Sequence, residues 1–236
     1  MAERPVPPGW MSRERLYPVG GVPGGDGVLL RRTVQRIADA IDGLDSCAGN
    51  APAYEAFTFA YDPAAWRAGA ADQLYSCALV GLAVLDCLGV EGPETDTPYR
   101  PRMGQAVAAV KNAGLDLHAW VDTTAIDAAL PTGPFVGLVG NNAGEGQEHV
   151  IVGLDGLDDD GECRVVEGGQ LSTHGKGFRI AKGFYKFERR DDVSVWARRI
   201  SPSPNPWRRL RGYIDLEACS FTQRATVPVE DGPEAA

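Results

Sequence analysis

Three kinds of side chain in this sequence could together perform nucleophilic catalysis: a cysteine, a histidine and a polar group beside the histidine. Such chemistry needs a thiolate, a neighbouring imidazole that holds and shuttles the proton, and a polar side chain that orients the imidazole. Cys77 is the candidate nucleophile and His149 the candidate base. Glu167 and Gln170 are both candidates for the orienting group. Gln73 precedes the cysteine by one helical turn and is a candidate donor to an oxyanion.

A predicted helix over residues 72–88, which stops at Gly89, would position Cys77. Apolar residues follow the cysteine so continuously that this helix is expected to be central and buried. Ser76 can cap its first turn, so Cys77 would lie at the positive end of the helix dipole, where the pKa of a thiol is lowered. The alternative is a core cysteine that packs as a small hydrophobic residue.

A predicted hairpin would position the histidine and its partner. His149 opens one predicted strand, and Glu167 ends the next. A turn centred near Asp158 and Asp159 would set His149 opposite about position 168. Because neighbouring strands are ~4.8 Å apart, Glu167 would lie one step from that point and within reach of the imidazole. Gln170 is the next candidate, and the sequence leaves the choice between the two open.

A metal site is the less favoured interpretation of the same residues. His149, His174 and Cys163 could supply ligands, but zinc sites use ligands at short local spacings and these three are scattered. The five cysteines, at positions 47, 77, 87, 163 and 219, form no CxxC pair, and their odd number argues against a disulfide framework. We therefore expect neither a metal nor a cofactor.

The elements around these residues change type near the middle of the chain. Helical periodicity predicts helices over 28–44, 72–88 and 102–113, the last ended by Gly114 as a left-handed C-cap. After a short strand over 115–121, strands are predicted over 134–140, 149–154, 163–167 and 194–200, with an exposed glycine-rich loop over 168–183 and a basic closing segment over 207–216. Helices followed by an antiparallel sheet predict an α+β fold with the helices on one side.

The ends of the chain differ in composition from its middle. Residues 1–28 are rich in proline and glycine and are expected to form a flexible arm, and residues 223–236 are expected to form a disordered acidic tail. Residues 29–222 are expected to form a single domain.

Charge and hydropathy exclude some partners. The net charge is −9, which argues against nucleic acid because phosphate contacts need a basic face. No signal peptide and no apolar run of ~20 residues is present, so we expect no membrane partner and a cytoplasmic location by default, with release by lysis or a dedicated secretion system as the alternative. The sequence assigns no oligomeric state.

Four motifs resemble the NlpC/CHAP-like branch of the papain-like cysteine peptidases and amidases, which includes bacterial and phage proteins. They are SCALVGL at 76–82, LPTGPFV at 130–136, EHVIVG at 148–153 and VVEGGQ at 165–170, and the similarity covers roughly residues 60–200 and the ending at 211–215. The resemblance implies a papain-like α+β fold in which a catalytic cysteine helix packs on a C-terminal antiparallel sheet. It also implies that Cys77 is the nucleophile, His149 the base and Glu167 or Gln170 the orienting group of a thiol hydrolase acting on peptidoglycan-like peptides.

The motifs also depart from that branch. The residues before the histidine strand read Pro131-Thr-Gly-Pro134 where such enzymes usually have Pro-Gly-Asp, and Ser76 stands before the cysteine where an aromatic residue or aspartate is common. Two alternatives follow: a catalytically inactive papain-like binding module, and a double-glycine-type processing peptidase, which the segment 107–115 also suits.

Overall fold

The structure of the protein is a computed structural model that describes a large part of the chain. The described residues are 27–42, 77, 80, 81, 84, 85, 88, 90, 106–124, 128–140, 148–171, 178–190, 194–202 and 204–220. The predicted acidic tail lies outside these residues, as does the predicted arm except for Gly27 and Val28, which begin a helix.

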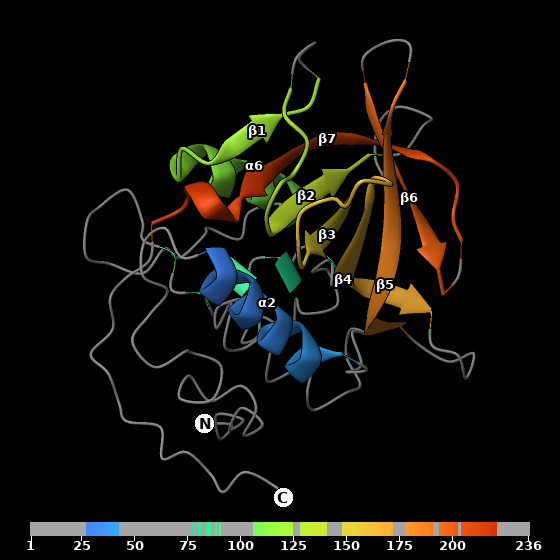
Figure 1. Cartoon of the computed structure of the whole chain (residues 1–236), viewed down its shortest axis with the longest axis horizontal. Helices are drawn as coiled ribbons and strands as arrows, with labels where there is room; N and C mark the ends of the chain where they lie inside the picture. Colours follow the sequence, from blue (N-terminus) through green and yellow to red (C-terminus); the bar gives the residue numbers. More distant parts are fainter. Residues whose placement is uncertain are drawn as a thin grey trace, which may run out of the picture.

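Seven strands form one antiparallel sheet in the described part of the chain. The strand order is β1-β7-β2-β3-β4-β5-β6, and a further pairing of β6 with β7 closes the last six strands into a barrel, with β1 outside it on β7 (Figure 1). The strands are β1 Trp120–Asp122, β2 Phe135–Val139, β3 His149–Gly153, β4 Glu162–Leu171, β5 Phe178–Arg189, β6 Val195–Ser201 and β7 Arg208–Asp215.

Helical structure covers one outer face of this barrel. Helix α2 is Gly27–Ile41, helix α6 is Ala106–Asp116, and a short 3-10 helix, η3, is Leu216–Ala218 (Figure 1). Six further residues have helical backbone, and all are buried at spacings of three and four: Cys77, Val80, Gly81, Val84, Leu85 and Leu88. This spacing puts them on one face of a helix that packs against the sheet.

The predicted papain-like α+β arrangement is wrong. The described chain is mostly β, with a closed six-stranded antiparallel barrel and only two short α-helices among the described elements. One reason for the wrong fold prediction is strand β5, whose first half falls in the segment 168–183 that the sequence predicts as a glycine-rich loop. Gly183 belongs to this strand, and a Cβ there would lie 2.7 Å from the carbonyl oxygen of Ser201. Gly183 therefore allows two strands to approach closely and does not mark a loop.

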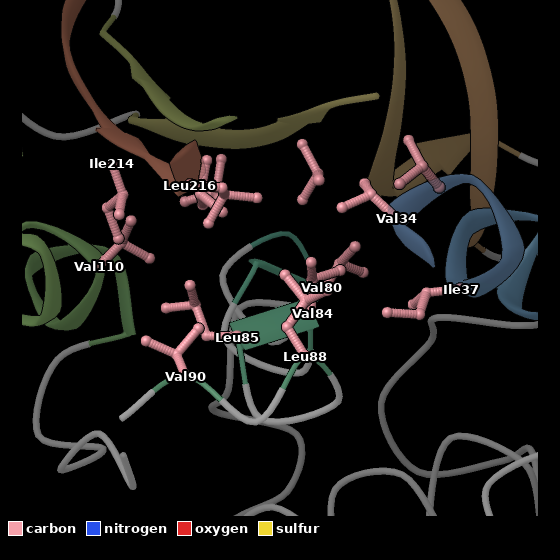
Figure 2. Packing of buried hydrophobic residues seen from close by; sticks show 14 of the residues in the cluster. Val34, Ile37, Val80, Val84, Leu85, Leu88, Val90, Val110, Ile214 and Leu216 are labelled. Carbon is pink, nitrogen blue, oxygen red and sulfur yellow. The ribbon is translucent and has the colours of Figure 1, made fainter. Parts of the chain in front are cut away.

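Alternation along the strands divides the apolar side chains into two layers. In β2, Val136 and Leu138 pack with the helices, whereas Phe135 and Val139 point into the barrel. Figure 2 shows the helix layer, in which side chains of α2, of the 80–90 segment and of α6 converge with Ile214 and Leu216. The same period of two places Glu167 inside the barrel, since it follows the inward-facing Cys163 and Val165.

The predicted turn between β3 and β4 is confirmed. The carboxylate of Asp158 accepts the backbone N–H groups of Asp160 and Glu162 at 3.0 and 2.7 Å, and Gly161 has a positive φ of 74°. A Cβ on Gly161 would also lie 2.6 Å from the carbonyl oxygen of Phe187. This local chemistry fixes the register of the hairpin that carries both His149 and Glu167.

The predicted end of α6 at Gly114 is wrong. The helix continues to Asp116, and the left-handed residue is His118, with φ of 53°. Ala119 N–H donates to Gly114 O at 3.0 Å and His118 N–H donates to Leu115 O at 3.1 Å, which is the bonding of a Schellman cap with histidine in the usual glycine position. Gly114 is instead a contact point inside the helix.

The packing at Gly114 predicts that Gly114→Ala lowers the free energy of unfolding. Alanine gains about 1 kcal/mol of helix propensity over glycine, but its Cβ would lie 2.9 Å from Ile214 Cγ1 and from Trp120 Cε3. Overpacking of this kind costs about 1–3 kcal/mol and outweighs the gain. Urea denaturation measures the difference, with Asn112→Ala, at an exposed position of the same helix, as the control that is not destabilised. Stabilisation by Gly114→Ala would contradict this packing.

Candidate active site

The β3–β4 hairpin brings a histidine and a glutamate into contact. Val152 pairs with Val166, so His149, three residues before Val152, lies diagonally across from Glu167, one residue after Val166. The Nε2 atom of His149 lies 2.5 Å from Oε2 of Glu167. The imidazole is 15% exposed, whereas the glutamate side chain is fully buried.

Cys77 reaches the same imidazole from the helix layer. Its side chain forms a hydrogen bond with His149 and is only 7% exposed. Because Nε2 of the imidazole already contacts Glu167, Nδ1 is the ring nitrogen left for the thiol. The structure therefore brings together three of the residues singled out from the sequence, in the order cysteine, histidine, carboxylate.

The contacts with Cys77 and Glu167 change the pKa of the His149 imidazole. Burial by itself lowers the pKa of His149, but the hydrogen bonds with Cys77 and Glu167 and the negative charges of both side chains outweigh it. The pKa is raised from 6.5 to about 9. At neutral pH the imidazole is thus an imidazolium held between two acidic groups.

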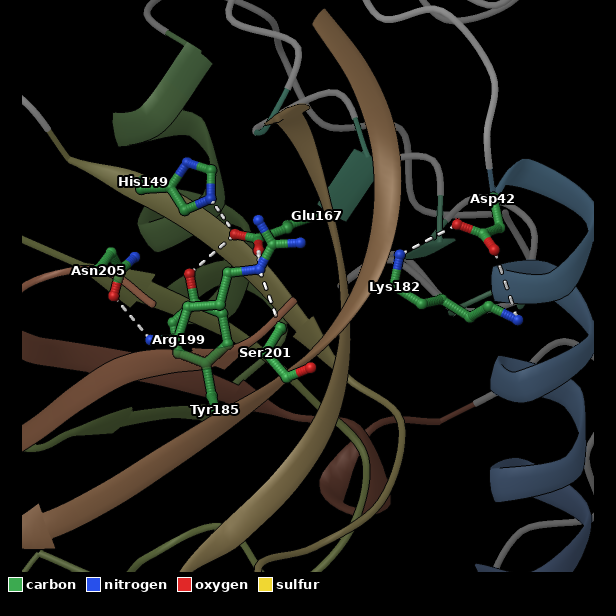
Figure 3. Close-up of polar contacts among 8 residues, drawn as sticks. All are labelled: Asp42, His149, Glu167, Lys182, Tyr185, Arg199, Ser201 and Asn205. Carbon is green, nitrogen blue, oxygen red and sulfur yellow. Dashed lines mark hydrogen bonds and ion pairs between the residues drawn. The ribbon is translucent and has the colours of Figure 1, made fainter. Parts of the chain in front are cut away.

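Two further side chains surround the buried carboxylate (Figure 3). The Tyr185 hydroxyl donates to Glu167 Oε2 at 2.8 Å, and Arg199 Nε lies 3.2 Å from Oε1. Burial, with the nearby charge of Glu167, raises the pKa of Tyr185 well above its ordinary value, so its hydroxyl stays a donor. Asn205 joins this group because its Oδ1 accepts the backbone N–H of Arg199 at 2.7 Å.

Sequence reasoning missed both Tyr185 and Arg199. A signal for Arg199 is present in the alternation of β6, where Val195 and Ala197 face the barrel interior and position 199 follows them at the same period. A charged residue at an inward position of a strand indicates a buried partner of opposite charge. Tyr185 carried no comparable signal, because its strand was not predicted.

The other predicted site residues are placed differently or lie outside the described residues. Gln170 belongs to β4, where its backbone pairs with Arg179 beyond a register shift that follows Glu167. Gln73 lies outside the described residues, as does His174. Cys163 does not join the site: its Sγ donates to the carbonyl oxygens of Asp155 and Arg164, and burial raises its pKa to about 12.

Metal binding finds no support in the described part of the chain. There, no group of three or more histidine, cysteine, aspartate and glutamate side chains could hold a metal ion. None of the described helices has the length and apolar content needed to cross a membrane.

The raised pKa of His149 predicts that its imidazole titrates near pH 9. The folded protein holds this proton more tightly than the unfolded chain, so the resulting stabilisation is complete below pH 6.5 and is lost as the pH rises through about 9. NMR titration of ¹⁵N-labelled histidine measures the pKa directly. Glu167→Gln removes a negative charge and should lower it, whereas His118→Asn, at an exposed histidine, should leave it unchanged. Titration of His149 near pH 6.5 would contradict this site.

In comparisons with known proteins, no family model matches this chain, and no curated protein or solved structure matches it.

Proposed function

We propose that the protein is a thiol-dependent amide hydrolase that uses Cys77 as nucleophile, His149 as acid and base, and Glu167 as the group that orients the imidazole. The observation that carries this proposal is the contact of 2.5 Å between His149 Nε2 and a fully buried Glu167, on an imidazole that also bonds Cys77. A carboxylate in that position selects one orientation of the ring and stabilises its charged form. The third residue in this proposal is therefore Glu167 and not Gln170.

In the proposed acylation, the Cys77 thiolate attacks the carbonyl carbon of an amide. His149 gives its proton to the leaving amine, and the carbon–nitrogen bond breaks to leave a thioester on the cysteine. In deacylation, the imidazole takes a proton from water, the hydroxide attacks the thioester, and the acid leaves as the thiolate and imidazolium are restored. Backbone N–H donation at Cys77 and the side chain of Gln73 are the proposed oxyanion donors.

For the substrate we propose peptides of cell-wall type. This part of the proposal rests on the resemblance of four short motifs and not on the fold, because the fold inferred from that resemblance is wrong. The partial exposure of His149, at 15%, is compatible with access of a substrate to the imidazole edge. An inactive binding module would share the fold but would not require a charged imidazole beside the thiol.

The proposal predicts that Cys77→Ala abolishes hydrolysis while the protein stays folded. Glu167→Gln should lower kcat/KM by roughly 10²-fold or more, because the charged form of the imidazole loses its partner. Release of peptides from purified peptidoglycan, followed by mass spectrometry, measures the rate, and circular dichroism reports folding. Cys219→Ala changes a buried cysteine that bonds the carbonyl oxygen of Asp215 and is the matched control with full activity.

Two results would separate the parts of the proposal. Turnover that persists in Cys77→Ala would refute the thiol mechanism. Absence of peptide release by the wild type, with a Cys77 that still reacts rapidly with iodoacetamide below pH 7, would refute the substrate class alone.

A further inference from the structure

We propose that Arg199 is a positioning residue that acts through Glu167: its buried guanidinium keeps the carboxylate ionised and so sets the lowest pH at which Cys77 remains a thiolate. This inference rests on the proposed function, because it concerns the acid–base state of the same site. Because the Glu167 carboxylate has no access to water, its counter-charges must lie inside the protein.

The contact is an ion pair in a fully enclosed place. Glu167 is 0% exposed and Arg199 is 4% exposed, with Arg199 Nε 3.2 Å from Glu167 Oε1. The same Nε lies 3.2 Å from the carbonyl oxygen of Ser201, to which it donates, so the link to Glu167 is one of charge and not of an aligned hydrogen bond. Because both side chains are buried, the charge of Arg199 acts strongly on the carboxylate of Glu167.

The fold holds the guanidinium where it is. The backbone N–H of Arg199 donates to Asn205 Oδ1 at 2.7 Å, and the backbone N–H of Asn205 donates to Arg199 O at 3.1 Å. Gly183, on the neighbouring strand β5, leaves the space that the side chain occupies, since a Cβ there would lie 3.0 Å from Arg199 Nε. The position of the charge is therefore fixed by two strands and a loop.

Three described strands each contribute a side chain that contacts the carboxylate of Glu167. His149 comes from β3, Tyr185 from β5 and Arg199 from β6 (Figure 3). Cys77 acts through the imidazole. Among these groups the tyrosine is an uncharged donor to the carboxylate. Arginine alone carries a charge that pH does not remove. The guanidinium of Arg199 therefore stays positively charged beside Glu167 whatever the protonation state of the imidazole.

The direction of the expected change in Cys77 reactivity follows from what happens when Glu167 is protonated. If Glu167 becomes protonated, the imidazolium loses this counter-charge and passes its own proton to the thiolate, which leaves a neutral carboxyl, imidazole and thiol. Removing the charge of Arg199 makes that first protonation easier, so it occurs at higher pH. Loss of the positive charge that lies 3.2 Å from the carboxylate is therefore expected to move the acid limit of Cys77 reactivity to higher pH.

Alkylation of Cys77 by iodoacetamide tests the inference without any substrate. The rate is measured as a function of pH for the wild type, Arg199→Met and Arg199→Lys, with the labelled cysteine identified by peptide mass spectrometry. In Arg199→Met the acid midpoint of the reaction should rise by about one pH unit or more. Arg199→Lys retains the charge and should stay close to the wild type.

Arg198→Met is the matched control, because Arg198 precedes Arg199 on β6 and contacts the Trp207 ring, 4.7 Å from its centroid. It removes the same charge from the protein and should not move the midpoint. Cys163 and Cys219 serve as internal references, since burial raises the pKa of each to about 12 and both should label slowly.

The outcomes separate this inference from the proposed function. A wild-type Cys77 that titrates as an ordinary thiol would refute both. A wild-type thiolate that persists below pH 7, with a folded Arg199→Met whose midpoint is unchanged, would refute the role of Arg199 alone, as would an equal shift in Arg199→Lys.

If Arg199→Met does not fold, thermal unfolding of a double variant decides the question. Arg199→Met combined with Glu167→Gln removes both charges, so the proposal expects it to fold and to melt above Glu167→Gln, in which the buried arginine has lost its carboxylate. A double variant that melts no higher than Glu167→Gln would overturn the proposal.

Discussion

The buried carboxylate of Glu167 is the constraint around which the rest of the structure is arranged. A charge that is fully removed from water destabilises a protein unless partners of suitable charge and geometry surround it. Here the partners come from three different strands: His149 from β3, Tyr185 from β5 and Arg199 from β6. These strands meet at one interior point because the sheet closes on itself through β7.

Closure of the barrel also explains why the site has two unequal sides. Apolar side chains on the helix-facing side of the sheet hold Cys77 in a dry layer, and apolar side chains inside the barrel enclose Glu167. His149 is the first residue of β3 and bridges these two layers. The imidazole is the most exposed of these three side chains, at 15%, whereas Glu167 is fully buried.

Local sequence signals predicted the hairpin but not the barrel. Asp158 and Gly161 define a turn whose chemistry is contained within a few residues, so the proximity of His149 and Glu167 could be estimated from spacing alone. The pairing of β7 with β2 joins residues far apart in the chain, such as Asp215 and Phe135, and leaves no local pattern. Glycines were the main source of error: Gly183 suggested a loop and Gly114 a helix end, whereas both make room for a neighbouring side chain.

The row from Arg199 through Glu167 and His149 to Cys77 has a consequence for the electrical balance of turnover. With the imidazolium and thiolate formed, its four charges alternate in sign and sum to zero. In the proposed acylation, the negative charge of sulfur disappears into the thioester as the proton of the imidazolium departs with the amine, so the sum is still zero. These four groups together thus stay electrically neutral through the proposed reaction, which needs no counter-ion to balance them.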